Sequence, residues 1–209
     1  MSQADLHQPI ASFLQKRVAE FEEIPEERKQ LLEQLGKYIR EKRAASVPTQ
    51  LTFLCTHNSR RSHLSQIWAK VAADHYDLNE VSTFSGGTEA TAMNERVVAS
   101  LRRTGFKINP SGDTDNNPIY LVTYAGNRSP LECFSKVYDQ PPNPHENFAA
   151  VMTCSSADQA CPVVPGCDAR LPIRYEDPKI SDDTDREAEI YDERSQQICR
   201  EMLYAMSRV

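Results

Sequence analysis

Residues 51–71 constrain this chain more than any other stretch, because an apolar run, a polar loop and a helical pattern follow one another there. The run Leu51-Thr-Phe-Leu54 has the composition of a buried strand, and apolar residues recur at helical spacing from Leu64 to Val71. Backbone N–H groups converge in such a loop and in the first turn of the helix, where the helix dipole adds partial positive charge. The stretch therefore predicts a strand, an anion-binding loop and a helix.

The predicted loop begins at Cys55 and contains Arg61 six positions later. The positive end of a helix favours a thiolate as well as an oxyanion, a guanidinium can bind two oxygens of one anion, and Ser62 can donate a hydrogen bond to the sulfur. A buried cysteine followed by a surface arginine is the alternative, since this spacing also occurs by chance. The strand–loop–helix context favours a nucleophile in an oxyanion-binding loop.

Composition limits the function classes that remain. The chain has 209 residues and a net charge of −6, which argues against general binding of nucleic acid or anionic membranes. No apolar run approaches the ~20 residues that cross a bilayer, and the N-terminus lacks the features of a signal peptide, so we expect a cytoplasmic protein. In that reducing compartment the six cysteines are expected to be chemical rather than structural. There is no CxxC and the histidines are scattered, so no metal site or other resident cofactor is predicted.

The rest of the pattern predicts an α/β fold: an open four-stranded parallel sheet flanked by helices, with an N-terminal helical hairpin and a β-hairpin insertion. Residues 1–47 are expected to form the helical extension, packed on the main domain or serving as a dimerisation or partner-binding arm. The main domain is expected over residues 50–209, with the insertion at about 113–147. Gly86-Gly87 predicts a sharp turn. Strands are predicted at 51–54, 80–85, 148–153 and 169–175, a strand pair at 118–125 and 131–138, and helices at 62–76, 92–104 and 183–208.

Two later strands deliver polar residues at their carboxyl ends. The strand at 148–153 precedes Cys154, and the strand at 169–175 precedes Asp177. In open parallel sheets the ligand lies beyond the carboxyl ends of the strands, so Cys55, Cys154 and Asp177 are expected at one edge of the sheet. Asp177 would then be the natural general acid for a leaving oxygen, although a turn aspartate before proline is the common alternative.

Cys154 and Cys161 lie seven residues apart on what the pattern predicts to be a polar loop. Thiol–disulfide exchange needs thiols on movable backbone, because bridging requires close Cα atoms. Two unreactive cysteines near a strand end fit the spacing equally well. Cys133 and Cys199 are expected to be packing residues, and Cys167 receives no predicted role.

The loop from Cys55 to Ser62, Cys-Thr-His-Asn-Ser-Arg-Arg-Ser, resembles the signature of low-molecular-weight protein tyrosine phosphatases and their arsenate reductase relatives. The segment Ser85-Gly-Gly-Thr-Glu and the later Asp177-Pro178 follow in the order of that family. Cys154-x6-Cys161-Pro162 is similar to the thioredoxin-coupled arsenate reductases and is not part of the phosphatase pattern. The resemblance covers roughly residues 50–209 and implies a thioredoxin-type arsenate reductase.

The resemblance also implies roles by position. Cys55 would attack arsenate, Asp177 would protonate the departing oxygen, and Cys154 would then attack the adduct and release arsenite. Cys161 would attack the resulting Cys55–Cys154 disulfide at Cys154, and thioredoxin would reduce the new disulfide. Asn58 matches an asparagine that orients the loop by hydrogen bonds. The residues implied to bind the oxyanion are Thr56, His57, Asn58, Ser59, Arg60, Arg61 and Ser62.

Three positions depart from the family pattern. His57 stands where glycine is usual, which predicts a local difference because a side chain disfavours positive φ. Arg60 stands where a second loop cysteine is common; its side chain could aid anion capture but is expected to face solvent. Lys179 replaces a tyrosine that often forms the wall of an aromatic substrate pocket, which weakens the phosphotyrosine interpretation.

Two other functions remain open at this point. Arsenate and phosphate are nearly isosteric, so a phosphatase that forms a phosphocysteine at Cys55 is the main alternative. A catalytically silent module that binds anions is the third hypothesis, and the intact Cys55, Arg61 and Asp177 argue against it. The expected partners are an arsenate- or phosphate-like oxyanion, thioredoxin and a second copy of the chain, bound through the N-terminal helices.

Overall fold

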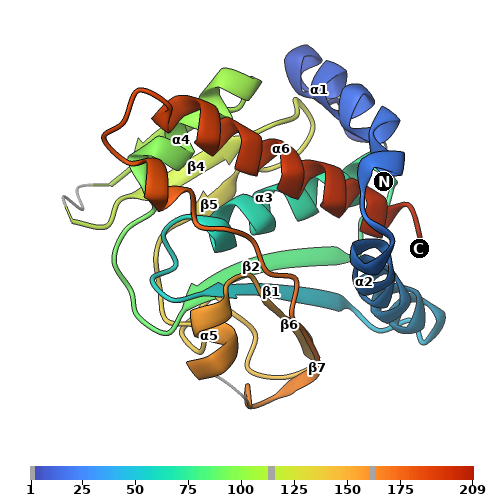
Figure 1. Ribbon diagram of the computed structural model, residues 1–209. Coiled ribbons are helices and arrows are strands. Elements are labelled where there is room, and N and C mark those ends of the chain that lie inside the picture. Colours follow the sequence, from blue (N-terminus) through green and yellow to red (C-terminus); the bar gives the residue numbers. More distant parts are fainter. Residues whose placement is uncertain (1–2, 113–115, 161–162) are drawn as a thin grey trace.

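The computed structural model describes residues 3–112, 116–160 and 163–209 and shows two sheets surrounded by helices (Figure 1). The main sheet is parallel, with strand order β2-β1-β6-β7, and a smaller antiparallel sheet has the order β3-β4-β5. The strands are β1 (Thr49–Cys55), β2 (Val81–Gly87), β3 (Lys107–Ser111), β4 (Ile119–Thr123), β5 (Leu131–Cys133), β6 (Phe148–Met152) and β7 (Cys167–Leu171). The helices are α1 (Gln8–Ala19), α2 (Glu26–Ala44), α3 (Arg61–His75), α4 (Glu95–Thr104), α5 (Ser155–Ala160) and α6 (Glu187–Met206), with 3-10 turns η1 (Phe21–Glu23) and η2 (Pro178–Ser181).

The main sheet confirms the predicted open four-stranded parallel sheet flanked by helices. Helices α3 and α6 cover one face of it and α5 covers the other (Figure 1). The central strand β1 pairs with β2 on one side and with β6 on the other. Every residue of β6 is buried, as is typical of a strand covered on both faces.

The N-terminal helices share the core of the main sheet. Both α1 and α2 pack on α6, and the ring of Phe13 stacks on Trp68 with 5.3 Å between centroids. Trp68 in turn meets the edge of Phe106 and donates to Ser195 Oγ at 2.9 Å. The apolar stripes of the two helices are therefore covered by their own chain, and the domain boundary and the dimer through these helices stay predictions. The buried stripe residues are Ile10, Leu14, Leu32, Leu35 and Ile39.

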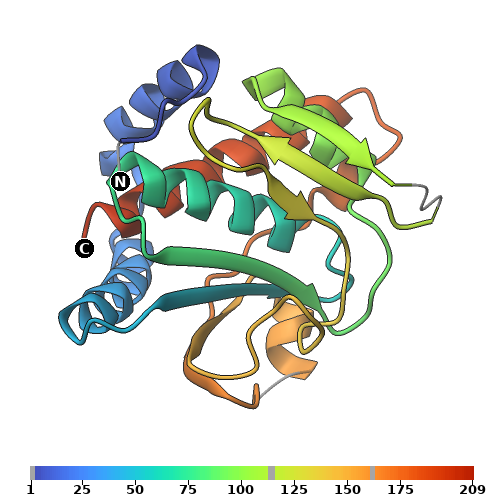
Figure 2. The same ribbon diagram turned by 180° about the vertical axis from the view of Figure 1, so that it is seen from behind.

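The insertion is larger than the predicted hairpin, because β3 adds a third strand. The predicted pair is present as β4 and β5, although β5 ends at Cys133 and not at residue 138. Strand β3 pairs with β4 through Lys107↔Thr123. Pro110 and the polar composition of β3 concealed this strand, yet proline is tolerated at the edge position that β3 occupies. Figure 2 shows the small sheet beside α3 and α4, and Tyr124 donates to Asp74 of α3 at 2.6 Å.

Gly86-Gly87 is not the predicted turn, since both residues belong to β2. A Cβ at Gly86 would lie 2.4 Å from the Cα of Tyr138, and one at Gly87 would lie 2.6 Å from the carbonyl oxygen of Thr56. Only glycine permits backbone to approach this closely. The Gly87 N–H donates to the Lys136 carbonyl at 2.9 Å, so the segment after β5 leaves the small sheet and runs along the end of β2.

Two predictions are wrong in the last third of the chain, one on where a strand ends and one on a segment predicted as a loop. The last strand stops at Leu171, because Pro172 has no N–H to continue the ladder. The chain then continues irregularly until the Tyr175 N–H donates to the Thr153 carbonyl at 3.0 Å, which returns it to the end of β6. The segment after Cys154, predicted as a loop, contains α5. Within the described ranges, no helix combines the length and the apolar character that crossing a membrane requires.

Candidate active site

The structure brings the chain segments of three predicted site residues together at the carboxyl edge of the main sheet. Cys55 ends β1, and Cys154 follows β6, which is tied to β1 where the Thr153 N–H donates to the Leu54 carbonyl at 2.7 Å. Asp177 lies at the same edge, where its Oδ2 accepts a hydrogen bond from Nη2 of Arg61 at 2.7 Å. Cys161, also predicted to take part in catalysis, lies outside the described residues.

Cys55 is buried, with 4% of its surface exposed, and its sulfur lies 3.1 Å from Ser62 Oγ. Asn58 fixes the direction of this hydrogen bond. Its Nδ2 donates to Ser62 Oγ at 2.8 Å, so the hydroxyl proton of Ser62 is left to point at the sulfur. The predicted contact between Ser62 and Cys55 is therefore present, oriented by an amide side chain.

Asn58 has a left-handed backbone conformation, with φ at 43°. Asparagine tolerates this left-handed region better than most residues, so the loop places its positive φ at 58 and spares His57. The His57 side chain extends outward, with its Nε2 3.7 Å from Glu89 Oε2. The described backbone therefore needs no positive φ at position 57, and the predicted local difference from the family stays a prediction.

The carbonyl groups of the loop point away from its centre. The Thr56 carbonyl accepts from Glu89 N at 2.9 Å and from Thr88 Oγ1 at 3.1 Å, and the Ser59 carbonyl accepts from Asn94 N at 2.9 Å. Among the described residues, no acceptor is found for the N–H groups of residues 56–62. Unmet donors at the start of α3 are what an oxyanion site requires.

Arg61 is turned toward the segment after β7. Its Nη1 donates to the Tyr175 carbonyl at 3.2 Å and its Nη2 to Asp177, while its buried Nε has no partner among the described residues. The second oxygen of Asp177 accepts from Lys179 N at 3.2 Å. Arg61, predicted to bind the anion, and Asp177, predicted to be the general acid, therefore form one ion pair.

The expectation that Arg60 faces solvent is wrong. Its Nε donates to the Tyr191 hydroxyl at 2.6 Å and its Nη2 to Asp182 at 2.8 Å, and Tyr191 itself donates to Asp182. These partners lie 122 and 131 positions away in sequence, so no local pattern could reveal them. The Nε and Nη2 of Arg60 link the start of α3 to α6 and to the turn before it.

Cys154 is buried rather than displayed on a polar loop, with 1% of its surface exposed. Its sulfur lies 3.7 Å from Thr56 Oγ1 and accepts from the Ala157 N–H at 3.3 Å. Cys154 and Cys55 belong to the same small cluster of buried side chains below the sheet edge, together with Leu54 and Met152. The second thiol therefore contacts the residue that follows the first.

Comparisons with known proteins give relatives in sequence and a neighbour in fold. No protein-family model matches the chain. An arsenate reductase of Staphylococcus epidermidis is 27% identical over 127 residues, covering 60% of this chain and 76% of the relative. One of Brevibacillus brevis is 28% identical over 126 residues, covering 60% and 74%. A solved YwlE arginine phosphatase, a mutant with a phosphorylated active-site serine, superposes with a TM-score of 0.50 at 13% identity, covering 76% of this chain and 94% of that one.

The chain has a low-molecular-weight phosphatase-like fold, with arsenate reductases among its relatives. The predicted fold class and the prediction of an enzyme are thereby confirmed.

In this phosphatase-like protein the insertion contributes contacts that the sequence analysis did not anticipate. The Lys136 N–H donates to Asn58 Oδ1 at 3.0 Å, and Ser135 Oγ donates to the His57 carbonyl at 2.9 Å. Ser135 also accepts from the Thr91 N–H at 2.8 Å. Residues 135 and 136 thus orient the loop, although they lie 78 positions from it in sequence.

Two buried titratable side chains lie beneath this loop. Burial lowers the pKa of His63 to about 3, so the ring is neutral at physiological pH, with its Nδ1 3.3 Å from Ser85 Oγ. Burial also lowers the pKa of Lys136 to about 8. Its ammonium donates to the Phe134 carbonyl at 3.1 Å and lies 4.3 Å from the centre of the Phe134 ring.

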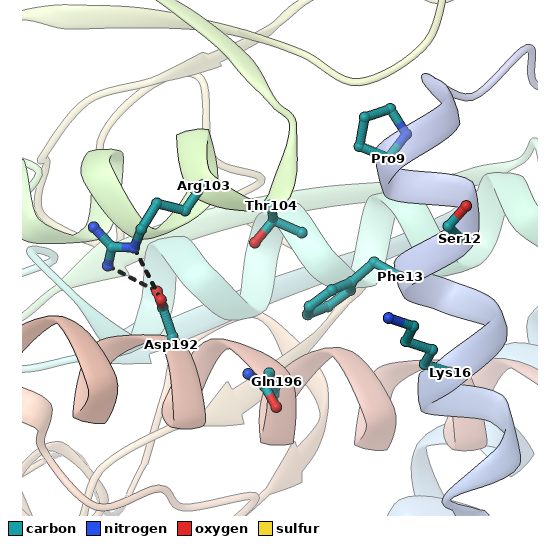
Figure 3. Close-up of a pocket in the computed structure, with 8 residues that line it drawn as sticks. All are labelled: Pro9, Ser12, Phe13, Lys16, Arg103, Thr104, Asp192 and Gln196. Atoms are coloured by element: carbon teal, nitrogen blue, oxygen red, sulfur yellow. Dashed lines mark hydrogen bonds and ion pairs between the residues drawn. The ribbon is translucent and has the colours of Figure 1, made fainter.

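A pocket of about 260 Å³ between α1, α4 and α6 contains none of the predicted site residues (Figure 3). Its guanidinium is already neutralised, because Arg103 donates to both oxygens of Asp192, from Nε at 2.9 Å and from Nη2 at 2.8 Å. In the described ranges, no group of three or more His, Cys, Asp or Glu side chains is placed to bind a metal ion. The lining residues are Pro9, Ser12, Phe13, Lys16, Arg103, Thr104, Asp192 and Gln196.

Proposed function

We propose that this enzyme reduces arsenate to arsenite with a cysteine nucleophile in the 55–62 loop and a second cysteine at position 154. The observation that carries the proposal is the buried sulfur of Cys154, 3.7 Å from Thr56 and in one cluster with Cys55. A phosphatase has no use for a second thiol at this position. A redox reaction does, because two electrons must come from two sulfurs.

In the first step the Cys55 thiolate attacks arsenic. A sulfur–arsenic bond forms, an arsenic–oxygen bond breaks, and the departing oxygen takes a proton from Asp177 and leaves as water. The loop N–H groups and Arg61 bind the remaining oxygens, with Ser62 stabilising the sulfur before attack. Arsenic stays pentavalent in this adduct.

In the second step Cys154 attacks the sulfur of Cys55. The new disulfide forms as the sulfur–arsenic bond breaks, its electron pair remains on arsenic, and arsenite departs. Two thiols have then been oxidised to a disulfide and arsenic has been reduced by two electrons, so the step balances. Cys161 would next attack Cys154 and free Cys55, and thioredoxin in the reducing cytoplasm would reduce the Cys154–Cys161 disulfide.

The ion pair between Arg61 and Asp177 fits the state before substrate binds. An arriving oxyanion offers Arg61 a doubly charged partner, and Arg61 can then turn from Asp177 to the anion. Binding would thus release the Asp177 side chain from the ion pair and leave it available to the departing oxygen.

The second candidate is hydrolysis of a phosphomonoester through a phosphocysteine at Cys55. The phosphatase-like fold and the unmet N–H donors of the loop support it, since phosphate and arsenate fit the same cradle. Both candidates share the first step. They differ in whether Cys154 is needed.

The experiment that separates them is Cys154→Ser in the full chain. Arsenate reduction is expected to be lost while hydrolysis of p-nitrophenyl phosphate stays within about twofold, because the serine cannot form a disulfide. Mass spectrometry after one turnover of the unaltered protein should find a disulfide that includes Cys154. Cys167→Ser, at a half-buried thiol on β7, is the matched control and should keep both activities. Thioredoxin-dependent reduction that survives Cys154→Ser would refute the relay.

A further inference from the structure

A pocket of about 350 Å³ adjoins the candidate active site and is rich in arginine. Tyr175, whose carbonyl accepts from Arg61, is one of its walls, and Ser155, the residue after Cys154, is another. The pocket therefore borders both the guanidinium that is proposed to bind the oxyanion and the second thiol. Its charged lining residues are Arg28, Arg174, Arg194, Arg200, Glu176 and Glu201.

Three of the four arginines have carboxylate partners. Arg28 pairs with Glu201 at 2.6 Å, Arg174 pairs with Asp158, and Arg200 pairs with Glu23 at 3.0 Å. These three pairs leave the charges of Arg194 and Glu176 in the lining of the pocket.

Arg194 is the arginine without a carboxylate. Within the described part of the chain, it makes no ion pair, and its one hydrogen bond runs from Nη1 to Gln197 Oε1. Its buried Nε has no acceptor. Burial lowers the pKa of Arg194, although the nearby carboxylates of Glu176 and Glu201 act in the opposite direction. A partly buried guanidinium with unmet donors costs free energy until an anion arrives.

Arg103 shows the satisfied form of the same group. Its Nε and Nη2 form a fork that receives both oxygens of Asp192 (Figure 3). In Arg194 the corresponding Nε–Nη2 edge has no acceptor among the described residues. Such a fork matches two oxygens of a tetrahedral anion.

We propose that this pocket is a second anion subsite, in which Arg194 binds a small tetrahedral oxyanion beside the catalytic loop. The volume accommodates an oxyanion with part of its hydration shell, and an anion-binding guanidinium next to a reactive site raises the local concentration of anionic substrate. The subsite goes beyond the proposed reaction and rests on it only for the choice of oxyanion.

Sulfate is the probe, because it is tetrahedral and is not consumed by the reaction. Equilibrium dialysis of labelled sulfate against the full, reduced chain should find two sites per molecule. Arg194→Gln should weaken one of them at least about tenfold, and Arg194→Lys should retain part of the affinity. Arg186→Gln removes an exposed arginine at the start of the same helix, where it pairs with Glu189, and should leave both sites intact.

Arg61→Gln should remove the loop site and leave the Arg194 site, which shows that the two are separate. A single sulfate in the unaltered protein, or two sulfates in Arg194→Gln, would overturn the proposal. A higher affinity of the Arg194 site for succinate than for sulfate, measured by displacement of labelled sulfate, would also overturn the proposal. The pocket would then select carboxylates. None of these measurements needs turnover, so loss of arsenate reduction would leave this result unaffected.

Discussion

The loop that begins at Cys55 and the segment that begins at Cys154 lie side by side but are constrained very differently. The loop is bonded through Asn58, Ser62 and the insertion, and its carbonyls are tied to residues 88–94. The sulfur of Cys154 has one weak contact to Thr56 and one N–H donor, and the residue precedes a helix of only six residues. The comparison teaches that the attacking sulfur is positioned before substrate arrives, whereas the second sulfur is near and lightly restrained. A relay of thiols requires this asymmetry, because one of them must move.

The largest expected effect comes from removing the fixed sulfur. Cys55→Ser should lower both arsenate reduction and p-nitrophenyl phosphate hydrolysis by at least roughly 10⁴-fold, because a serine hydroxyl is a far weaker nucleophile in this cradle. Steady-state rates of both reactions test this. If either activity survived at a tenth of its original rate, the loop would not be the reaction centre.

Steric crowding of the loop that begins at Cys55 should have the next largest effect. Gly87→Ala would place a methyl group 2.6 Å from the Thr56 carbonyl oxygen and 2.7 Å from Asn58 N. The loop must shift, so we expect a loss of about 1–3 kcal/mol in the free energy of unfolding and a fall in both activities. Urea denaturation and rate measurements check the result, with Ser82→Ala on the exposed face of β2 as control. Unchanged kinetics in Gly87→Ala would show that the loop needs no exact position.

Acid should lower the free energy of unfolding through His63, which lies beneath the loop that begins at Cys55. The pKa of its ring is about 3 when folded and 6.5 when unfolded, so the unfolded state binds more protons between these values and stability falls as pH decreases through that window. The slope should approach ~1.4 kcal/mol per pH unit below pH 6. Urea denaturation at several pH values should show a smaller slope in His63→Gln than in His145→Gln, which alters an exposed ring. Equal slopes in the two variants would exclude His63 as the cause.

The smallest effect is expected from removing the weak contact between Thr56 and Cys154. Thr56→Val removes the hydroxyl that lies 3.7 Å from the sulfur of Cys154 and keeps the shape of the side chain. Arsenate reduction should change by about threefold, with hydrolysis of p-nitrophenyl phosphate unaltered, since a weak contact to sulfur contributes little. A large fall in hydrolysis would instead place the Thr56 hydroxyl in the step that both reactions share.

Much of the site could be predicted because its chemistry is encoded locally. Residues 51–71 read as strand, loop and helix, and the structure has β1, the loop and α3 at those positions. The contact between Ser62 and Cys55 and the proximity of Asp177 to Arg61 follow from loop and sheet geometry. The roles of these residues, and that of Cys161, stay predictions until activity is measured.

The misses share one cause, which is dependence on residues far away in sequence. Arg60 was expected in solvent because its partners, Asp182 and Tyr191, approach only when α6 packs on α3. The sequence predicts a polar loop at Cys154, because its neighbours in the chain give no sign of the cluster that buries it.

By itself the sequence determined the parallel sheet, the anion-binding loop and the edge at which cysteines 55 and 154 emerge, since periodicity and strand direction are local properties of a chain. Only the tertiary structure decided how the loop is oriented. The insertion presents the Lys136 N–H to Asn58 across 78 positions, and Ser62 is directed at the sulfur as a result. Hydrogen bonds between segments so distant form after the sheet and helices pack, and for that reason no pattern along the chain records them.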